Sequence, residues 1–129
     1  MNIYCGTDII EVKRVEKAIL RTSGFKEKVF TKAEIEYAEN KGELVKYGHY
    51  AGRFAAKEAV YKAISNVDNA VEFNQIEVLN NKANKNRPVV RIYKKEIEDM
   101  RLSGKLTIDI SISHIKEYAT AVAYVKMSE

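Results

Sequence analysis

Two acidic residues far apart in the chain, Asp8 and Glu58, have side chains of the type that metal-assisted phosphate chemistry uses. Asp8 ends an apolar stretch that predicts a strand, and Glu58 and Lys62 lie four residues apart in a predicted helix. Two carboxylates with phosphate oxygens make a usual magnesium site, because this small cation prefers oxygen ligands and keeps several waters. Taken alone, Asp8 is better interpreted as the N-cap of a helix that opens near Glu11. The sequence does not show that Asp8 and Glu58 meet.

The same predicted helix carries two cations on one side. Arg53 and Lys57 share a face because residues four apart lie on the same side of a helix, and no anion lies between them. Periodicity alone favours a surface helix that tolerates this repulsion, and the functional alternative is contact with phosphate oxygens. Another side of the helix is made of small residues, which allows a second backbone to approach closely: Ala55, Ala56, Ala59 and Ala63.

The other candidate residues have weaker local signals. His114 follows a strand, where histidine is more often a turn or capping residue, but an imidazole at a phosphate site donates a hydrogen bond or moves a proton. A zinc site is not expected from two histidines and one cysteine, and His49 is assigned no role. An early helix is basic on one side and predicts either a solvated face or a docking surface for an acidic helix: Lys13, Arg14, Lys17 and Arg21.

Alternation and capping signals predict the elements that position these residues. We expect helices over residues 11–23, 31–42 and 94–102, and another that begins between residues 47 and 53 and ends near residue 65. The helix over residues 31–42 opens with a Thr31–Glu34 capping box. We expect strands over residues 3–9, 72–79, 88–93, 106–113 and 118–125. This order predicts one α+β domain over residues 1–129, with a mostly antiparallel sheet packed against helices.

Composition narrows the class of protein. The chain has 129 residues, 46% of them hydrophobic, and one cysteine, which excludes an intrachain disulfide and fits a reducing cytoplasm. We find no signal peptide, and the longest apolar stretch, 119–125, is too short to span a bilayer. The net charge of +4 is compatible with an acidic protein, a phosphate-rich small molecule or nucleic acid. A chain this small often completes its site with a neighbouring subunit, so we expect a homo-oligomer.

Three stretches in order resemble holo-acyl carrier protein synthase, the small bacterial type of 4'-phosphopantetheinyl transferase. They are Gly6-Thr7-Asp8-Ile9, then Gly52-Arg53-Phe54-Ala55-Ala56-Lys57-Glu58-Ala59 with Lys62-Ala63, and Ile112-Ser113-His114. Their spacing fits the family across almost the whole chain. The resemblance implies a magnesium-dependent enzyme that transfers 4'-phosphopantetheine from coenzyme A to a serine of apo-acyl carrier protein. The products are holo-acyl carrier protein and adenosine 3',5'-bisphosphate.

The resemblance also implies a role for each candidate residue. Asp8 and Glu58 would hold Mg²⁺, and Lys62 would contact the transferred phosphate or help protonate the leaving group. The nucleotide phosphates would be held by Arg53, Lys57 and His114, and the carrier would dock on Lys13, Arg14 and Arg21. The serine proton would go to Glu58 or to a water on the metal, and the sequence leaves both open. The family implies a cytoplasmic homotrimer with sites between subunits, and we expect a role in fatty acid biosynthesis.

Two departures from the family pattern keep alternatives open. Residues 65–69 replace a glycine-rich turn, and Lys85-Asn86-Arg87-Pro88 replaces a glycine-containing hairpin, although asparagine tolerates positive φ. One alternative is a nucleic-acid binder, favoured by charge but lacking an aromatic stacking motif or a helix-turn-helix signature. The other is a coenzyme A binder or carrier-docking protein without activity, supported only by residues 65–69.

Overall fold

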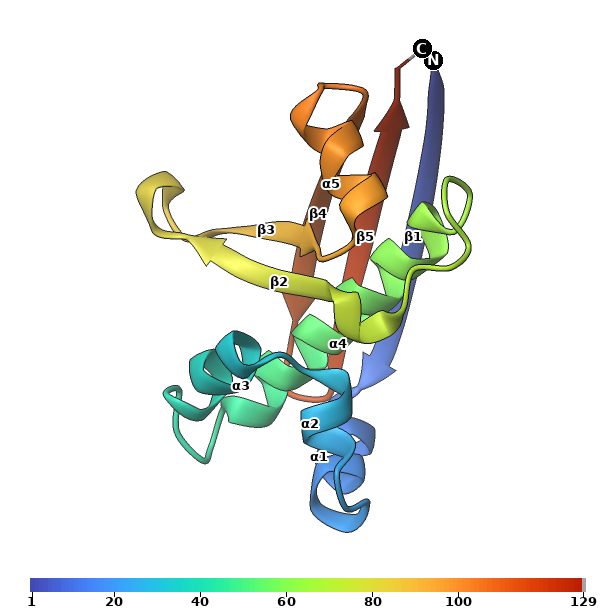
Figure 1. The fold of residues 1–129 in the computed structure, drawn as a ribbon. Helices are drawn as coiled ribbons and strands as arrows, with labels where there is room; N and C mark the ends of the chain where they lie inside the picture. The colour runs from blue at the N-terminus through green and yellow to red at the C-terminus, as the bar shows by residue number, and fades with distance from the viewer. Residues whose placement is uncertain (129) are drawn as a thin grey trace.

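A long helix, α4 (Lys46–Ile64), lies against one face of a three-stranded antiparallel sheet (Figure 1). This computed structural model describes residues 1–128. The sheet has the order β1 (Asn2–Glu11), β5 (Tyr118–Met127) and β4 (Leu106–His114), so the first and last strands are neighbours. The helix packs on all three strands and therefore forms the centre of the molecule.

The remaining elements surround α4. A separate antiparallel hairpin, β2 (Ile76–Asn81) and β3 (Arg87–Ile92), crosses beside β4, and α5 (Lys95–Leu102) joins β3 to β4. Three short helices gather near the start of α4 (Figure 1): α1 (Val12–Arg21), α2 (Phe25–Val29) and α3 (Lys32–Glu39). Short 3-10 turns flank β2: η1 (Phe73–Gln75) and η2 (Lys82–Asn84). Within residues 1–128, no helix is long and apolar enough to cross a membrane.

The three-stranded sheet is covered on one face only. Along β5, buried Ala119, Ala121 and Ala123 alternate with exposed residues, because successive side chains of a strand point to opposite faces. The buried residues face α4. The exposed ones share a face with the residues opposite them on β1, as in the pair Thr7 and Val122. The sheet therefore presents an uncovered face on the side away from α4.

The approach of β1 to α4 is unusually close at one point. A Cβ atom placed on Gly6 would lie 2.0 Å from the carbonyl oxygen of Ala59 and 3.1 Å from the backbone nitrogen of Ala63. Ala59 and Ala63 are fully buried at this crossing. The expectation that the alanine side of this helix allows another backbone to approach is confirmed, and the approaching backbone is β1.

The fold class and most elements agree with the sequence prediction. The α+β fold, the antiparallel pairing and the Thr31–Glu34 capping box are all present. The five-residue helix α2 was not expected, and β2 begins at Ile76 because Glu72 and Gln75 close the turn before it. Asn86 takes a positive φ of 59°, which confirms that it replaces glycine in the hairpin. Residues 65–69 have no positive φ, so this turn does not need glycine or a residue that replaces glycine.

We predict that Gly6→Ala lowers the free energy of unfolding by about 3 kcal/mol, since the added methyl group collides with backbone that a side-chain rotation cannot move. Chemical denaturation measures the loss. Gly48→Ala is the matched control: its Cβ meets His114 only at ordinary contact distance, and alanine favours a helix. Equal stability of Gly6→Ala and the wild type would contradict the crossing described here.

Candidate functional site

The crossing of β1 and α4 brings three of the predicted residues together. Lys62 donates a hydrogen bond from Nζ to the carbonyl oxygen of Thr7 at 2.9 Å, and Nζ lies 3.5 Å from Asp8 Oδ1. Glu58 lies one turn before Lys62 on α4 and interacts electrostatically with both Asp8 and Lys62. Asp8 is inside β1 rather than at its end, and the N-cap of α1 is Glu11. The capping interpretation of Asp8 is therefore wrong.

The electrostatics of this carboxylate pair favour a bound cation. Burial raises the pKa of Glu58, the negative charge of Asp8 raises it further, and Lys62 only partly opposes them. Among residues 1–128, no group of three or more histidine, cysteine and acidic side chains gathers at one place. Two carboxylates with no softer ligand fit Mg²⁺, whose remaining positions are commonly filled by water and phosphate oxygens.

Lys57 lies in a different environment from the one predicted. Its side chain is 0% exposed, and Nζ donates to Glu34 Oε1 at 2.8 Å. Glu34 also accepts from the backbone N–H groups of Thr31 at 2.9 Å and Val78 at 2.7 Å. Burial lowers the pKa of Lys57, and the charge of Glu34 opposes that effect. The ion pair with Glu34 was not predicted, and contact of Lys57 with phosphate stays a prediction.

Arg53 is also buried but keeps an unused donor. The residue is 6% exposed, donates from Nη2 to Asn80 Oδ1, and its guanidinium carbon lies 4.0 Å from the centre of the Tyr37 ring. Its Nε is buried without a hydrogen-bond partner within the described part of the chain. The interpretation of this helix as a solvated surface is therefore wrong for the side that carries Arg53 and Lys57.

His114 is exposed and lies over the first turns of α4. A Cβ atom on Gly48 would meet its Nδ1 at 3.4 Å, and its ring centre lies 5.3 Å from that of His49. The His49 ring in turn meets the Tyr37 ring edge-on at 5.5 Å, and Lys41 Nζ lies 4.6 Å from the same Tyr37 ring. We call the five residues the cationic cluster: Tyr37, Lys41, His49, Arg53 and His114.

Only Arg53 and His114 of the cationic cluster were identified from the sequence. Tyr37, Lys41 and His49 were missed, although Tyr37 with Lys41 and His49 with Arg53 are each four residues apart. Along α4, the cluster is separate from the carboxylates. Arg53 precedes Glu58 by five residues, or about 7.5 Å of helix.

The basic residues of α1 are on the surface. Val12 and Val15 face the core, and Lys13, Arg14, Lys17 and Arg21 are exposed beside Leu20, whose side chain is also exposed. This arrangement gives a basic surface with an apolar residue in it.

Comparison with known proteins identifies the family. The model of the 4'-phosphopantetheinyl transferase superfamily matches residues 4–123. The chain belongs to this superfamily. The match includes Asp8, Glu58, Lys62 and His114, and the alternative of a nucleic-acid binder loses its support.

Individual members of the superfamily resemble the whole chain. A holo-[acyl-carrier-protein] synthase of Ruminiclostridium cellulolyticum is 42% identical over 131 residues, covering 100% of this chain and 96% of the relative. An ACPS–CoA complex from Chronobacterium ammoniagenes has a TM-score of 0.81 at 27% identity, covering 100% of both chains. A holo-(acyl-carrier-protein) synthase of Bacillus anthracis in complex with CoA (3',5'-ADP) has a TM-score of 0.76 at 32% identity, covering 97% and 96%.

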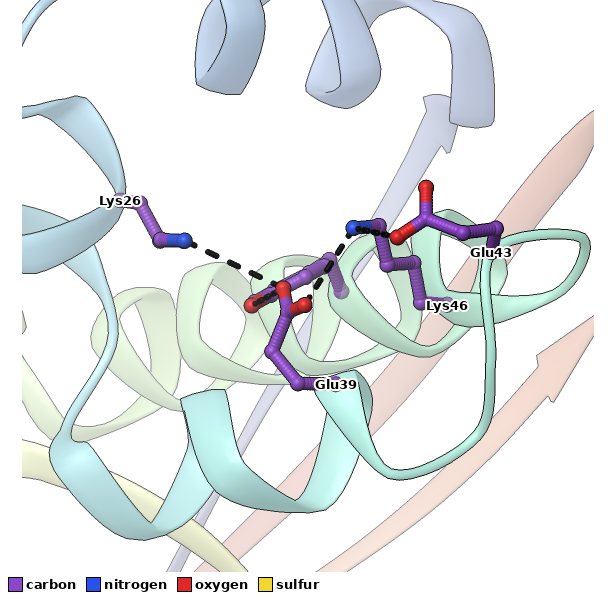
Figure 2. A network of polar contacts seen from close by, with 5 residues as sticks. Lys26, Glu39, Glu43 and Lys46 are labelled. Carbon is purple, nitrogen blue, oxygen red and sulfur yellow. Dashed lines mark hydrogen bonds and ion pairs between the residues drawn. The ribbon is translucent and has the colours of Figure 1, made fainter.

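In this superfamily member, a polar network fixes the start of α4 that carries His49 and Arg53. Glu39 accepts a hydrogen bond from the buried Tyr50 hydroxyl at 2.6 Å and lies 3.3 Å from Lys46 Nζ (Figure 2). Lys46 also pairs with Glu43 at 2.8 Å, and Lys26 of α2 lies 3.9 Å from Glu39. The network ties α2, α3 and α4 together and thereby holds the cationic cluster in place.

We predict that Tyr50→Phe lowers the free energy of unfolding by about 1 kcal/mol at neutral pH, the usual contribution of one such hydrogen bond. The Tyr50 hydroxyl is the largest cause that lowers the pKa of Glu39 below its ordinary 4.5. The stabilisation is therefore complete above pH 4.5 and is lost as the pH falls through the lower folded-state pKa. Denaturation between about pH 2.5 and 7 should show the two proteins converging in acid.

Tyr61→Phe is the control for that series, because Tyr61 is exposed and forms no hydrogen bond through its hydroxyl among the described contacts. A constant gap between Tyr50→Phe and the wild type at every pH would contradict the proposed link to Glu39.

Proposed function

We propose that this protein transfers the 4'-phosphopantetheine group of coenzyme A to a serine of apo-acyl carrier protein, and that it does so with Mg²⁺. The observation that carries the proposal is the meeting of Asp8, Glu58 and Lys62 at the β1–α4 crossing. Holo-acyl carrier protein synthases matching nearly the full length of the chain support the reaction. The products are holo-acyl carrier protein and adenosine 3',5'-bisphosphate.

The reaction is a phosphoryl transfer in which the chain supplies position and charge. The serine hydroxyl oxygen forms a bond to the β-phosphorus of coenzyme A, and the bond from that phosphorus to the adenosine 3',5'-bisphosphate oxygen breaks. Asp8 and Glu58 would hold Mg²⁺, and the ion would neutralise the charge that develops on the phosphate oxygens. Lys62 has its ammonium beside both carboxylates and partly exposed, so it can donate to the transferred phosphate or to the leaving oxygen.

The nucleotide phosphates have a second place to bind. We assign them to Arg53 and His114 of the cationic cluster, because the buried Nε of Arg53 lacks a partner and the His114 ring is exposed. Lys57 has a supporting role: its ion pair with Glu34 fixes α3 and β2 against α4. Coenzyme A bound to the Chronobacterium ammoniagenes and Bacillus anthracis proteins supports the choice of ligand.

The carrier protein would dock on α1. Lys13, Arg14 and Arg21 are exposed there, and an acidic helix on the carrier would complement their charge. We place the reaction in the cytoplasm and in the supply of carrier protein for fatty acid biosynthesis. The single cysteine fits a reducing compartment.

A homotrimer would cover the open face of the sheet. Ile9 is 68% exposed and Val122 is 46% exposed on the side away from α4, beside Ile3 and Tyr124. Such contiguous apolar surface commonly marks a protein interface. The Asp8 side chain points to the α4 side, but β1 is an edge strand of this sheet, so a second copy that extends past this edge would border the carboxylate pair. This arrangement supports sites between subunits.

We predict that Asp8→Asn and Glu58→Gln each reduce transfer by at least about 100-fold, because each removes a charged ligand from a site that needs both. The assay incubates protein, apo-carrier, coenzyme A and Mg²⁺ and weighs the carrier by mass spectrometry. A carrier whose acceptor serine is replaced by alanine is the control for specific transfer. If the wild type adds no phosphopantetheine mass, the proposed function fails; if both folded variants stay active, the metal assignment fails.

Without Mg²⁺ at neutral pH, Glu58→Gln should melt at a higher temperature than the wild type, because the repulsion between Asp8 and Glu58 is removed. Added Mg²⁺ should raise the melting temperature of the wild type and leave Glu58→Gln nearly unchanged. Calorimetry with and without the ion measures both effects. Equal responses of the two proteins to Mg²⁺ would show that the ion binds elsewhere.

We predict that Val122→Lys converts the trimer to monomers, since a charge at the centre of an apolar interface is costly to bury. Light scattering after size exclusion gives the mass directly. Leu44→Lys is the matched control: Leu44 is fully exposed in the turn between α3 and α4, so the mass of this variant should equal that of the wild type. A monomeric wild type would contradict the assembly.

A further inference from the structure

His49 lies inside the cationic cluster and has no role in the transfer as described. Its ring contacts Tyr37 on one side and His114 of β4 on the other. Within residues 1–128, the charged groups with a resolved influence on His49 come from three elements and are all basic: Lys41 after α3, Arg53 of α4 and His114 of β4. The cluster therefore gathers positive charge with no carboxylate against His49.

Two observations indicate that the cluster is built for an anion. Arg53 is buried with Nε unpaired, and an unmade bond of this kind is costly unless a ligand completes it. Burial and the neighbouring cations lower the pKa of His49 to about 4 from an ordinary 6.5, so the ring is neutral in the free protein at pH 7. Burial is the larger cause, and an anion at this position would oppose the part of the lowering that the neighbouring cations produce and so would raise the pKa of His49.

We propose that His49 takes up a proton when a phosphate monoester binds between Arg53 and His114, so that recognition of this group is coupled to protonation. The inference rests on the proposed function, because coenzyme A carries a phosphate monoester on its ribose in addition to its diphosphate. The distance of about 7.5 Å along α4 from Arg53 to Glu58 separates this phosphate from the one that reacts.

The coupling predicts a particular pH dependence. Binding that takes up a proton weakens as the pH rises through the pKa of His49 in the complex. The phosphate monoester itself loses its second charge below about pH 6, which weakens binding in acid. The affinity of the wild type for coenzyme A should therefore pass through a maximum at mildly acidic pH.

His49→Phe tests the proposal, because phenylalanine keeps the ring contacts with Tyr37 and His114 but cannot take up a proton. Calorimetric titrations at pH 6.5 in buffers of different ionisation enthalpy count the protons taken up. The ligands are coenzyme A and 3'-dephospho-coenzyme A, which lacks the monoester. On binding coenzyme A, the wild type should gain as much as about one proton more than it gains on binding 3'-dephospho-coenzyme A.

In His49→Phe this excess should disappear, and affinity for coenzyme A at pH 6.5 should fall by about tenfold, the size of one charge-assisted contact. Affinity for 3'-dephospho-coenzyme A should change by less than about twofold. His49→Gln, also neutral, guards against a packing effect of phenylalanine and should lose the same excess.

The inference is overturned if folded His49→Phe or His49→Gln keeps the excess proton uptake, or if both ligands lose affinity equally. Those results differ from the ones expected if the proposed function fails. If the proposed function fails, the wild type binds neither ligand and transfers nothing to the carrier.

Discussion

The site depends on how closely two backbones approach at Gly6 and Ala59. Glu58 is the residue before Ala59 on α4, and Asp8 is two residues after Gly6 on β1, so the distance between strand and helix sets the distance between the carboxylates. Any side chain at Gly6 would separate them, because the Ala59 carbonyl already occupies that space. Small residues that appear to serve only packing therefore determine whether two like charges can share a cation.

A buried ion pair positions the residues of the cationic cluster. Lys57 and Glu34 are both enclosed, and burying such a pair is stabilising only if its remaining hydrogen bonds are made. The N–H groups of Thr31 and Val78 satisfy Glu34, which joins α3 and β2 to α4. Tyr37 of α3 and Asn80 of β2 are thereby held against Arg53. The buried pair thereby helps to orient the buried side chain of Arg53.

The sequence was informative where the signal is local. Alternation in β4 and β5 and the Thr31–Glu34 box gave elements close to those observed. Residue types made Asp8 and Glu58 candidates and the family resemblance gave them and Lys62 their roles, but their meeting depends on a strand–helix crossing that no local pattern encodes. The ion pair of Lys57 was not predicted because its partner, Glu34, is 23 residues away and was already assigned to the capping box. His49 was missed for the same reason, since it is on α4 and its ring partner His114 is at the end of β4, far along the chain.

The charges at the start of α4 are the reverse of those that usually stabilise the N-terminal end of a helix, and a bound ligand would explain this exception. The N-terminal end of a helix carries partial positive charge and favours acidic side chains, yet the first turn of α4 has none and contains Lys46 and His49. Glu39 and Glu43 neutralise Lys46, whereas within residues 1–128 neither His49 nor Arg53 forms an ion pair, and Glu34 influences Arg53 only through its charge. The carboxylate Glu58 lies toward the opposite end. Under the proposed function, a ligand with two separated phosphate groups would complement both halves of this helix, one directly through cations and the other through a metal ion held by Asp8 and Glu58.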